Sequence, residues 1–199
     1  MQIGRSVRRS LLSRFLVGAL ATGVLVTTAC GDSDASSDVS SGSSSASGTV
    51  AASTLKAVSA VARYSSIATS TVNGQTTKIR GLQIFISDKP NTCSGMNLSS
   101  ATVLDVAVRG DTVKAGTYKV IDGMQKTPED GEAVADFNSV SDACKDVVAQ
   151  ASTGGTVTIT RADTRVTGTL DITFEGGKVS GAFEAELCPD DQVETSCAP

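Results

Sequence analysis

Apolar and polar residues alternate with a period of two along the C-terminal third of the chain. Two segments, 165–174 and 178–187, place an apolar or small residue at every second position. A shorter run, 156–160, alternates valine and isoleucine with threonine in the same way. Such alternation is typical of strands with one buried face. Turn residues at 162–164 and 175–177 separate the three segments, so the pattern predicts a meander of three consecutive antiparallel strands.

Similar alternation predicts strands earlier in the chain. Asn73-Gly74 is a strong hairpin signal and is predicted to join a strand ending at Val72 to one that spans 76–87. Three further strands are predicted at 104–109, 117–121 and 133–140. Together with the meander this makes about eight strands, which predicts an all-β fold, a single antiparallel β-barrel or β-sandwich.

Two segments have helical spacing instead. Leu55, Val58 and Val61 recur at intervals of three residues, and Cys144 and Val148 are separated by four within the segment 141–151. The sequence therefore allows one or two short helices beside the strands. For the first segment, a strand that begins within 60–68 is the alternative.

Two glycines, Gly168 and Gly181, occupy matched positions on the apolar faces of the last two predicted strands. Glycine weakens a strand, so this placement indicates a close approach of another chain segment or a sharp curvature of the sheet. In one interpretation the missing side chains leave room for a ligand inside a barrel. In the other, which the dense packing of protein interiors favours, they let the sheet coil tightly over its own core.

The first 29 residues have the composition of an export signal. Four arginines precede an apolar stretch, Phe15–Val26, which is too short to span a membrane as an ordinary helix. The sequence Val26-Thr27-Thr28-Ala29-Cys30 follows. Here the chain resembles a bacterial lipoprotein, in which the signal peptide is removed before a cysteine that carries the lipid.

The resemblance implies that residues 1–29 are removed and that Cys30 becomes a lipidated N-terminus carrying acyl chains such as palmitate. Two or three acyl chains anchor a protein stably, whereas one chain binds only marginally. The implied location is the bacterial cell envelope, with the domain outside the cytoplasm, and Gly31 favours the outer membrane in a Gram-negative organism. Arg8-Arg9 is similar to a twin-arginine motif, so that route and general secretion both stay open.

A tether follows the lipidation site. The stretch from Gly31 to Ser53 contains ten serines in 23 residues and no aromatic residue, so it is too polar to bury a core of its own. The expected organisation is a signal peptide at 1–29, a lipidated cysteine and tether at 30–53, and a β-domain at 54–199.

Charge and composition exclude several classes of function. Removal of the signal peptide would leave 13 basic against 21 acidic residues, a net charge of −8. This argues against nucleic-acid binding and against binding of anionic membranes by the folded domain. The chain has no histidine, which excludes histidine-dependent catalytic dyads and triads and histidine-ligated metal sites.

Four cysteines remain after Cys30, namely Cys93, Cys144, Cys188 and Cys197. In an exported domain an even number without a Cys-x-x-Cys motif favours two structural disulfides over a metal site. Three pairings are possible. We favour the pairing of Cys188 with Cys197, because it would pin the tail to the end of the last strand. Cys93 would then pair with Cys144.

Carboxylates are the remaining candidate groups. One cluster in a predicted loop lacks the spacing of a calcium loop, and we interpret it as a solvated charged loop. A second set lies on the outward face of the meander, which is the ordinary solvent side of such a sheet, with calcium or a basic partner as the alternative. The two sets are Asp122, Glu129, Asp130, Glu132 and Asp136, and Asp171, Glu175, Glu184 and Glu186.

These observations identify no active site, cofactor or metal. We expect a lipid-anchored cell-envelope protein without enzymatic activity, which displays its β-domain to an envelope protein or polymer or has a structural role. The alternative is a carrier whose barrel encloses a small apolar ligand, as in lipocalins, although their G-x-W signature has no counterpart here. A hydrolase that uses carboxylates alone is a third hypothesis. An interior cavity would favour the carrier, and a filled core would favour the display module.

Overall fold

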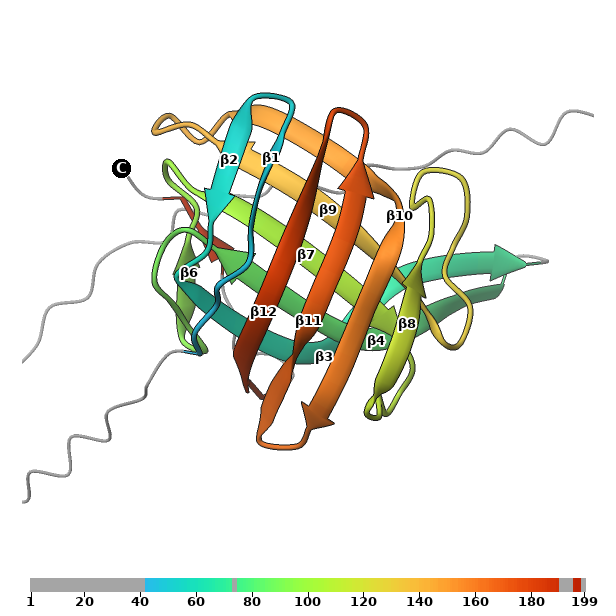
Figure 1. Cartoon of the computed structure of the whole chain (residues 1–199). Coiled ribbons are helices and arrows are strands. Elements are labelled where there is room, and N and C mark those ends of the chain that lie inside the picture. The colour runs from blue at the N-terminus through green and yellow to red at the C-terminus, as the bar shows by residue number, and fades with distance from the viewer. Residues whose placement is uncertain (1–41, 73–74, 190–194, 198–199) are drawn as a thin grey trace, which may run out of the picture. The chain divides into compact units, whose positions relative to one another are not determined.

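The computed structural model of the chain describes residues 42–72, 75–189 and 195–197. They belong to one compact unit, Asp38–Pro199. They form strands joined by turns and loops, with no helix among them (Figure 1). The all-β fold class expected from the sequence is therefore confirmed. Within these ranges no helix is long and apolar enough to cross a membrane.

The strands in chain order are β1 (Ser47–Val50), β2 (Ser53–Lys56), β3 (Ser59–Val72), β4 (Gln75–Ser87), β5 (Asn91–Thr92), β6 (Gly95–Asn97), β7 (Thr102–Arg109), β8 (Gly116–Val120), β9 (Glu132–Val140), β10 (Asp146–Ala162), β11 (Arg165–Phe174), β12 (Gly177–Leu187) and β13 (Thr195–Ser196).

Ten of these strands form one mixed sheet, and eight of the ten close into a ring. The order around the ring is β11, β10, β8, β9, β7, β4, β3 and β12, and β12 pairs back to β11. Most neighbours are antiparallel as expected, but β3 with β12 and β8 with β9 are parallel pairs. In Figure 1 the strands β12, β11, β10 and β8 lie in front of β3, β4, β7 and β9. The hairpin of β1 and β2 extends the sheet from β12.

The C-terminal meander of β10, β11 and β12 is confirmed. Its register pairs Gly168 with Phe183 and Leu170 with Gly181. Along β11 every second residue is buried and the residues between them face outward, as the alternation predicts. The inward residues join a core of 25 buried side chains to which all eight ring strands contribute. We call this the inner core.

The two short helices allowed by the sequence are absent from the described residues. Leu55 lies on β2, and Val61 lies within a stretch of β3, residues 59–62, that is buried on both faces, which hides the period-two pattern. In the second segment a turn is followed by β10, and a bulge between Asp146 and Val148 disturbs the alternation. The helical spacing in the first segment therefore arises from a strand that is buried on both faces. In the second segment it arises from a strand that contains a bulge.

The folded domain begins earlier than expected. The sequence predicts a tether up to residue 53, but residues 43–50 pair with β12 and Gly42 bridges to Ala60 of β3. The Ser45 N–H donates to the Ala182 carbonyl (3.0 Å) and the Glu184 N–H donates to the Ser43 carbonyl (2.8 Å). Backbone hydrogen bonds hold this segment, so its polar composition does not prevent its ordering.

A smaller apolar cluster lies on the outer face of the ring. It contains Val61, Phe85, Met96, Val103 and Cys188, among others, and we call it the outer cluster. The short strands β5, β6 and β13 form a second sheet, and Met96 of β6 contributes to this cluster. Part of the back layer is thus covered on both faces.

Candidate functional site

Both disulfides connect distant parts of the chain. Cys93 bonds to Cys188 with the Cα atoms 5.2 Å apart, and Cys144 bonds to Cys197 with the Cα atoms 5.9 Å apart. All four cysteines are paired as expected, but the favoured pairing was wrong. The end of β12 lies beside β3 and the outer cluster, which brings Cys188 to Cys93 rather than to its sequence neighbour. Two disulfides indicate an oxidising location outside the cytoplasm.

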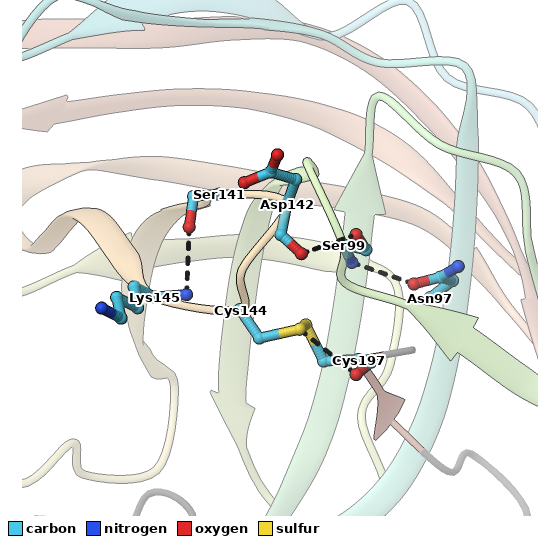
Figure 2. Close-up of a disulfide and its surroundings, with 7 residues drawn as sticks. All are labelled: Asn97, Ser99, Ser141, Asp142, Cys144, Lys145 and Cys197. Carbon is cyan, nitrogen blue, oxygen red and sulfur yellow. Dashed lines mark hydrogen bonds between the residues drawn. A yellow bond between two sulfur atoms is a disulfide. The ribbon is translucent and has the colours of Figure 1, made fainter. Parts of the chain in front are cut away.

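The second disulfide joins the turn before β10 to the end of β13. Figure 2 shows Cys144 and Cys197 among the hydrogen bonds that order this turn. The Ser99 hydroxyl donates to the Asp142 carbonyl (3.3 Å), and the Lys145 N–H donates to Ser141 Oγ (3.2 Å). These contacts are those of a structural staple, and the predicted lipidation site, Cys30, lies outside the described residues.

The acidic residues of the loop between β8 and β9 mostly have basic partners. Lys126 Nζ lies 3.2 Å from carboxylate oxygens of both Glu129 and Glu132, and Arg109 Nε lies 2.9 Å from Asp130 Oδ1. Hydrogen bonds from the Glu129 N–H and from Lys126 lower the pKa of Glu132. The residues that the structure describes contain no group of three or more potential metal ligands. The three ion pairs therefore hold this loop in place, whereas Asp136 of the predicted cluster lies on β9 and not in a loop.

Two of the four acids on the outer face of the meander, Asp171 and Glu184, are also paired with cations. Asp171 accepts from Lys178 Nζ at 2.7 Å, and Glu184 accepts from Arg165 at 2.5 Å. Asp163 in the adjoining turn accepts from Arg161, and this hydrogen bond is the main cause that lowers the pKa of Asp163 to about 2. The pairing of Asp171 and Glu184 lowers the net negative charge of this face, which also carries Glu175, Glu186 and several threonine hydroxyls.

An open pocket of about 520 Å³ lies on this surface. The backbone segment 43–45 lies along one side, and β10 and β11 contribute threonines such as Thr160 and Thr167, whose hydroxyls are 2.9 Å apart. The lining offers hydroxyl groups and one carboxylate, Glu184, so it suits weak polar contacts with a ligand. The lining residues are Ser43, Ser44, Ser45, Thr160, Thr167, Gly168, Thr169, Ala182, Phe183 and Glu184.

Both matched glycines lie where another chain segment comes close. A Cβ atom on Gly168 would lie 2.1 Å from the Thr158 carbonyl oxygen and 3.0 Å from Phe183 Cζ. A Cβ atom on Gly181 would lie 2.6 Å from the Ala46 Cα. These contacts agree with the close-packing interpretation, since neighbouring chain occupies the space that a side chain would need.

Asp105 is not among the candidates predicted from the sequence, but its pKa is strongly shifted. It lies on the outer face of β7, where its Oδ2 accepts a hydrogen bond from Gln83 Nε2 (3.2 Å), and Asp136 faces it in register on β9. The pKa of Asp105 is raised to about 7, mainly because the group is buried and also because of the negative charge of Asp136. Arg63 and Gln83 act in the opposite direction.

A carboxyl group that titrates near neutrality is suited to acid–base chemistry, but buried structural networks produce the same shift. Gln83 also accepts a hydrogen bond from Ser65 Oγ (2.5 Å), and Arg63 lies over the Phe85 ring with 5.4 Å to its centroid. Asp105 thus belongs to a polar network on the sheet. In the sequence Asp105 occupies an outward position of an alternating strand, and this pattern predicts only a residue that faces solvent.

Comparison of the chain with models of known protein families, with curated proteins and with solved structures finds no match. The function therefore has to be inferred from the chain itself.

Proposed function

We propose that the chain is a lipid-anchored protein of the bacterial cell envelope, without enzymatic activity, which presents its β-domain to another envelope macromolecule. The observation that carries this proposal is the pairing of the cysteines. Cys93, Cys144, Cys188 and Cys197 are consumed in two disulfides. The fifth cysteine, Cys30, follows an apolar segment and a small residue, as in lipoprotein signals, and is left over for lipid attachment.

The distance from the anchor supports display close to a membrane. Eleven residues separate Cys30 from Gly42, where the described fold begins. Fully extended, this stretch spans at most about 40 Å. An anchored domain would thus remain within about one domain diameter of the lipid headgroups, with its disulfides on the oxidising side.

The composition of the inner core favours display over the carrier alternative. Large side chains such as Phe137, Leu82 and Ile172 are fully buried between the two layers. Phe137 and Phe174 contact edge to face, with ring centroids 5.8 Å apart. A carrier of a small apolar ligand would need that space for the ligand.

The test of anchoring must separate lipidation from retention of an uncleaved signal peptide. The native chain and a Cys30→Ser variant would be expressed with a clickable palmitate analogue. A second pair would carry an ordinary cleavable secretory signal in place of residues 1–29. We expect label on the native chain alone, and both chains of the second pair should be released in soluble form. A Cys93→Ser/Cys188→Ser variant is the matched control and should keep the label.

Two results would contradict the proposal. One is an unlabelled native chain with a free thiol at Cys30. The other is a chain with the ordinary signal and Cys30→Ser that still sediments with membranes, because its attachment would then depend on the folded domain.

A further inference from the structure

The hairpin of β3 and β4 extends well beyond the ring. β12 pairs with β3 only at Val61 and Ala62, and β7 pairs with β4 only as far as Gly81. Past these points, in the described part of the chain, the two strands pair only with each other (Figure 1). We call residues 66–72 and 75–80 the arm. A two-stranded ribbon without a core is marginally stable alone, so its projection needs an explanation.

The arm is basic although the protein is acidic. The segment from Ser59 to Ser87 contains no aspartate or glutamate, but it contains three basic residues, Arg63, Lys78 and Arg80. The net charge of −8 for the chain from Cys30 onward therefore conceals a separation of charge. The acids lie on the other strands and loops, and an anion would approach this molecule at the arm.

The two arm cations share a face with hydroxyl groups. Lys78 and Arg80 are two residues apart on β4, so they point to the same side, and both are exposed. The register places Thr69 opposite Lys78 and Ser66 opposite Arg80. Ammonium, guanidinium and hydroxyl donors side by side are the groups that proteins use to contact phosphate oxygens.

The base of the arm adds one further cation. The Gly110 N–H donates to the Arg80 carbonyl (3.2 Å), and the Val113 N–H donates to the Tyr64 hydroxyl (3.0 Å). The loop between β7 and β8 is thereby held against the arm, with Lys114 exposed on it. Asp111, which follows Gly110 in the same loop, is an exposed acid close to this cation in the sequence.

We propose that the arm binds a phosphate-bearing polymer of the cell envelope. A polymer can lie along an exposed ribbon and contact several cations at once, which suits a binding element with no cavity. Pairing of two arms from separate copies is disfavoured, because a lysine on an exposed strand opposes edge-to-edge association. The choice of an envelope polymer rests on the proposed function, whereas the affinity for polyphosphate does not.

The anchoring bilayer is a less suitable partner than a separate polymer. The described chain enters the fold at Gly42, which bridges to Ala60 near the start of β3. The arm lies at the other end of this strand, and Val72 is roughly 40 Å along it from Ala60. The arm therefore extends away from the point where the tether joins the domain.

The experiment measures binding of immobilised long-chain inorganic polyphosphate by the full-length protein in detergent. The test variant is Lys78→Gln/Arg80→Gln. The matched control is Lys56→Gln/Lys119→Gln, which removes the same charge from two exposed residues on β2 and β8. We expect the affinity for polyphosphate to fall about tenfold or more in the arm variant and to change by no more than about twofold in the control. The slope of log affinity against log salt concentration should become shallower by about two in the arm variant.

Three outcomes would overturn the inference: no binding by the native protein, equal losses of affinity in both variants, or a native protein that doubles in mass through an interaction that the arm variant loses. Polyglutamate should compete poorly, and strong competition would indicate a general cation site instead of a phosphate site. Vesicles of anionic lipid that bind as tightly as polyphosphate would assign the arm to a membrane. The arm variant should still incorporate palmitate, so failure here is distinct from failure of the anchor.

Discussion

Gly181 of β12 lies directly against the backbone of Ala46, and a Cβ atom on Gly181 would stand 2.6 Å from the Ala46 Cα. Gly181 also has a φ of +144°, a conformation that residues with a side chain rarely adopt. Its absent side chain lets the serine-rich N-terminal segment close the gap between β12 and β3. The first prediction concerns this contact.

Gly181→Ala should destabilise the domain by roughly 2 to 4 kcal/mol, since the added methyl group meets backbone that cannot rotate away. Urea unfolding measures the loss, and limited proteolysis should show earlier cleavage within residues 42–50. The control is Gly154→Ala on β10, where a Cβ atom would meet nothing within 4 Å. Equal stability of the two variants would mean that the N-terminal segment does not pack on β12.

The meander could be predicted from the sequence because one of its faces is buried and the other is solvated. Leu170 and Ile172 face the inner core while Thr169 and Asp171 face outward, so burial and sequence period coincide. The segment 42–50 could not be predicted in this way. It is held by backbone hydrogen bonds to β12, and backbone groups are the same in every sequence.

The candidate sites were less predictable than the strands because they depend on contacts between distant segments. The pocket exists where Ser43–Ser45 lie beside Glu184, far away in the sequence. The partner of Cys188 depended on which loop covers the end of β12, and spacing carries no information on that point. Asp105 reads as a solvent-facing residue, and only tertiary structure reveals its neighbours.

The second prediction compares the two disulfides. The sequence separations are 95 and 53 residues, which give about 4.7 and 4.2 kcal/mol in the chain-entropy estimate, too similar to rank them. Packing separates them instead. Cys188 is 3% exposed and belongs to the outer cluster, whereas Cys144 and Cys197 are half-buried.

Replacement of Cys93 and Cys188 by alanine should therefore cost about 1 to 2 kcal/mol more than replacement of Cys144 and Cys197, because it also loosens packing in the outer cluster. Mild reduction should open Cys144–Cys197 first, since a thiolate reaches it more easily. Thermal unfolding of the two double variants and mass spectrometry after timed alkylation check the two statements. A reversed order of reduction would show that the outer cluster does not shield Cys188.

The third prediction is a pH dependence that originates at Asp105. Its pKa is raised to about 7 in the folded state by burial and by Asp136. Between about pH 4 and pH 7 the folded protein therefore retains a proton that the unfolded chain has lost. Stability from this group is fully present below about pH 4 and falls as the pH rises to 7, by about 1.4 kcal/mol per unit of pKa difference at most.

Asp105→Asn keeps an acceptor for Gln83 Nε2 and removes the ionisation. We expect the variant to be more stable than the native protein at pH 8 and nearly equal to it at pH 4. Denaturant titrations at a series of pH values give the difference curve, and Asp163→Asn serves as the control, since Asp163 has a lowered pKa. If the difference in the free energy of unfolding between native protein and variant is constant across pH 4–8, the pKa of Asp105 is not raised by folding.

The fourth prediction concerns Ser152, which is fully buried on β10. Its hydroxyl accepts a hydrogen bond from the Ala135 N–H (3.1 Å) and donates one to the Ile121 carbonyl (2.9 Å). It thus links β9, β10 and the end of β8 at the point where β8 separates the other two strands. Ser152→Ala would leave one buried donor and one buried acceptor without their partner, at a cost of roughly 2 to 4 kcal/mol.

Chemical denaturation measures this loss, and hydrogen exchange at the Ala135 amide locates it, because that N–H should lose protection ahead of its neighbours. The control is Thr117→Val, which removes the exposed hydroxyl pair with Thr158 (3.1 Å) and should change the free energy of unfolding by no more than about 0.5 kcal/mol. If Ser152→Ala is as mild as the control, water must replace the hydroxyl there. The junction of β8, β9 and β10 would then be open to solvent, contrary to its packing against the inner core.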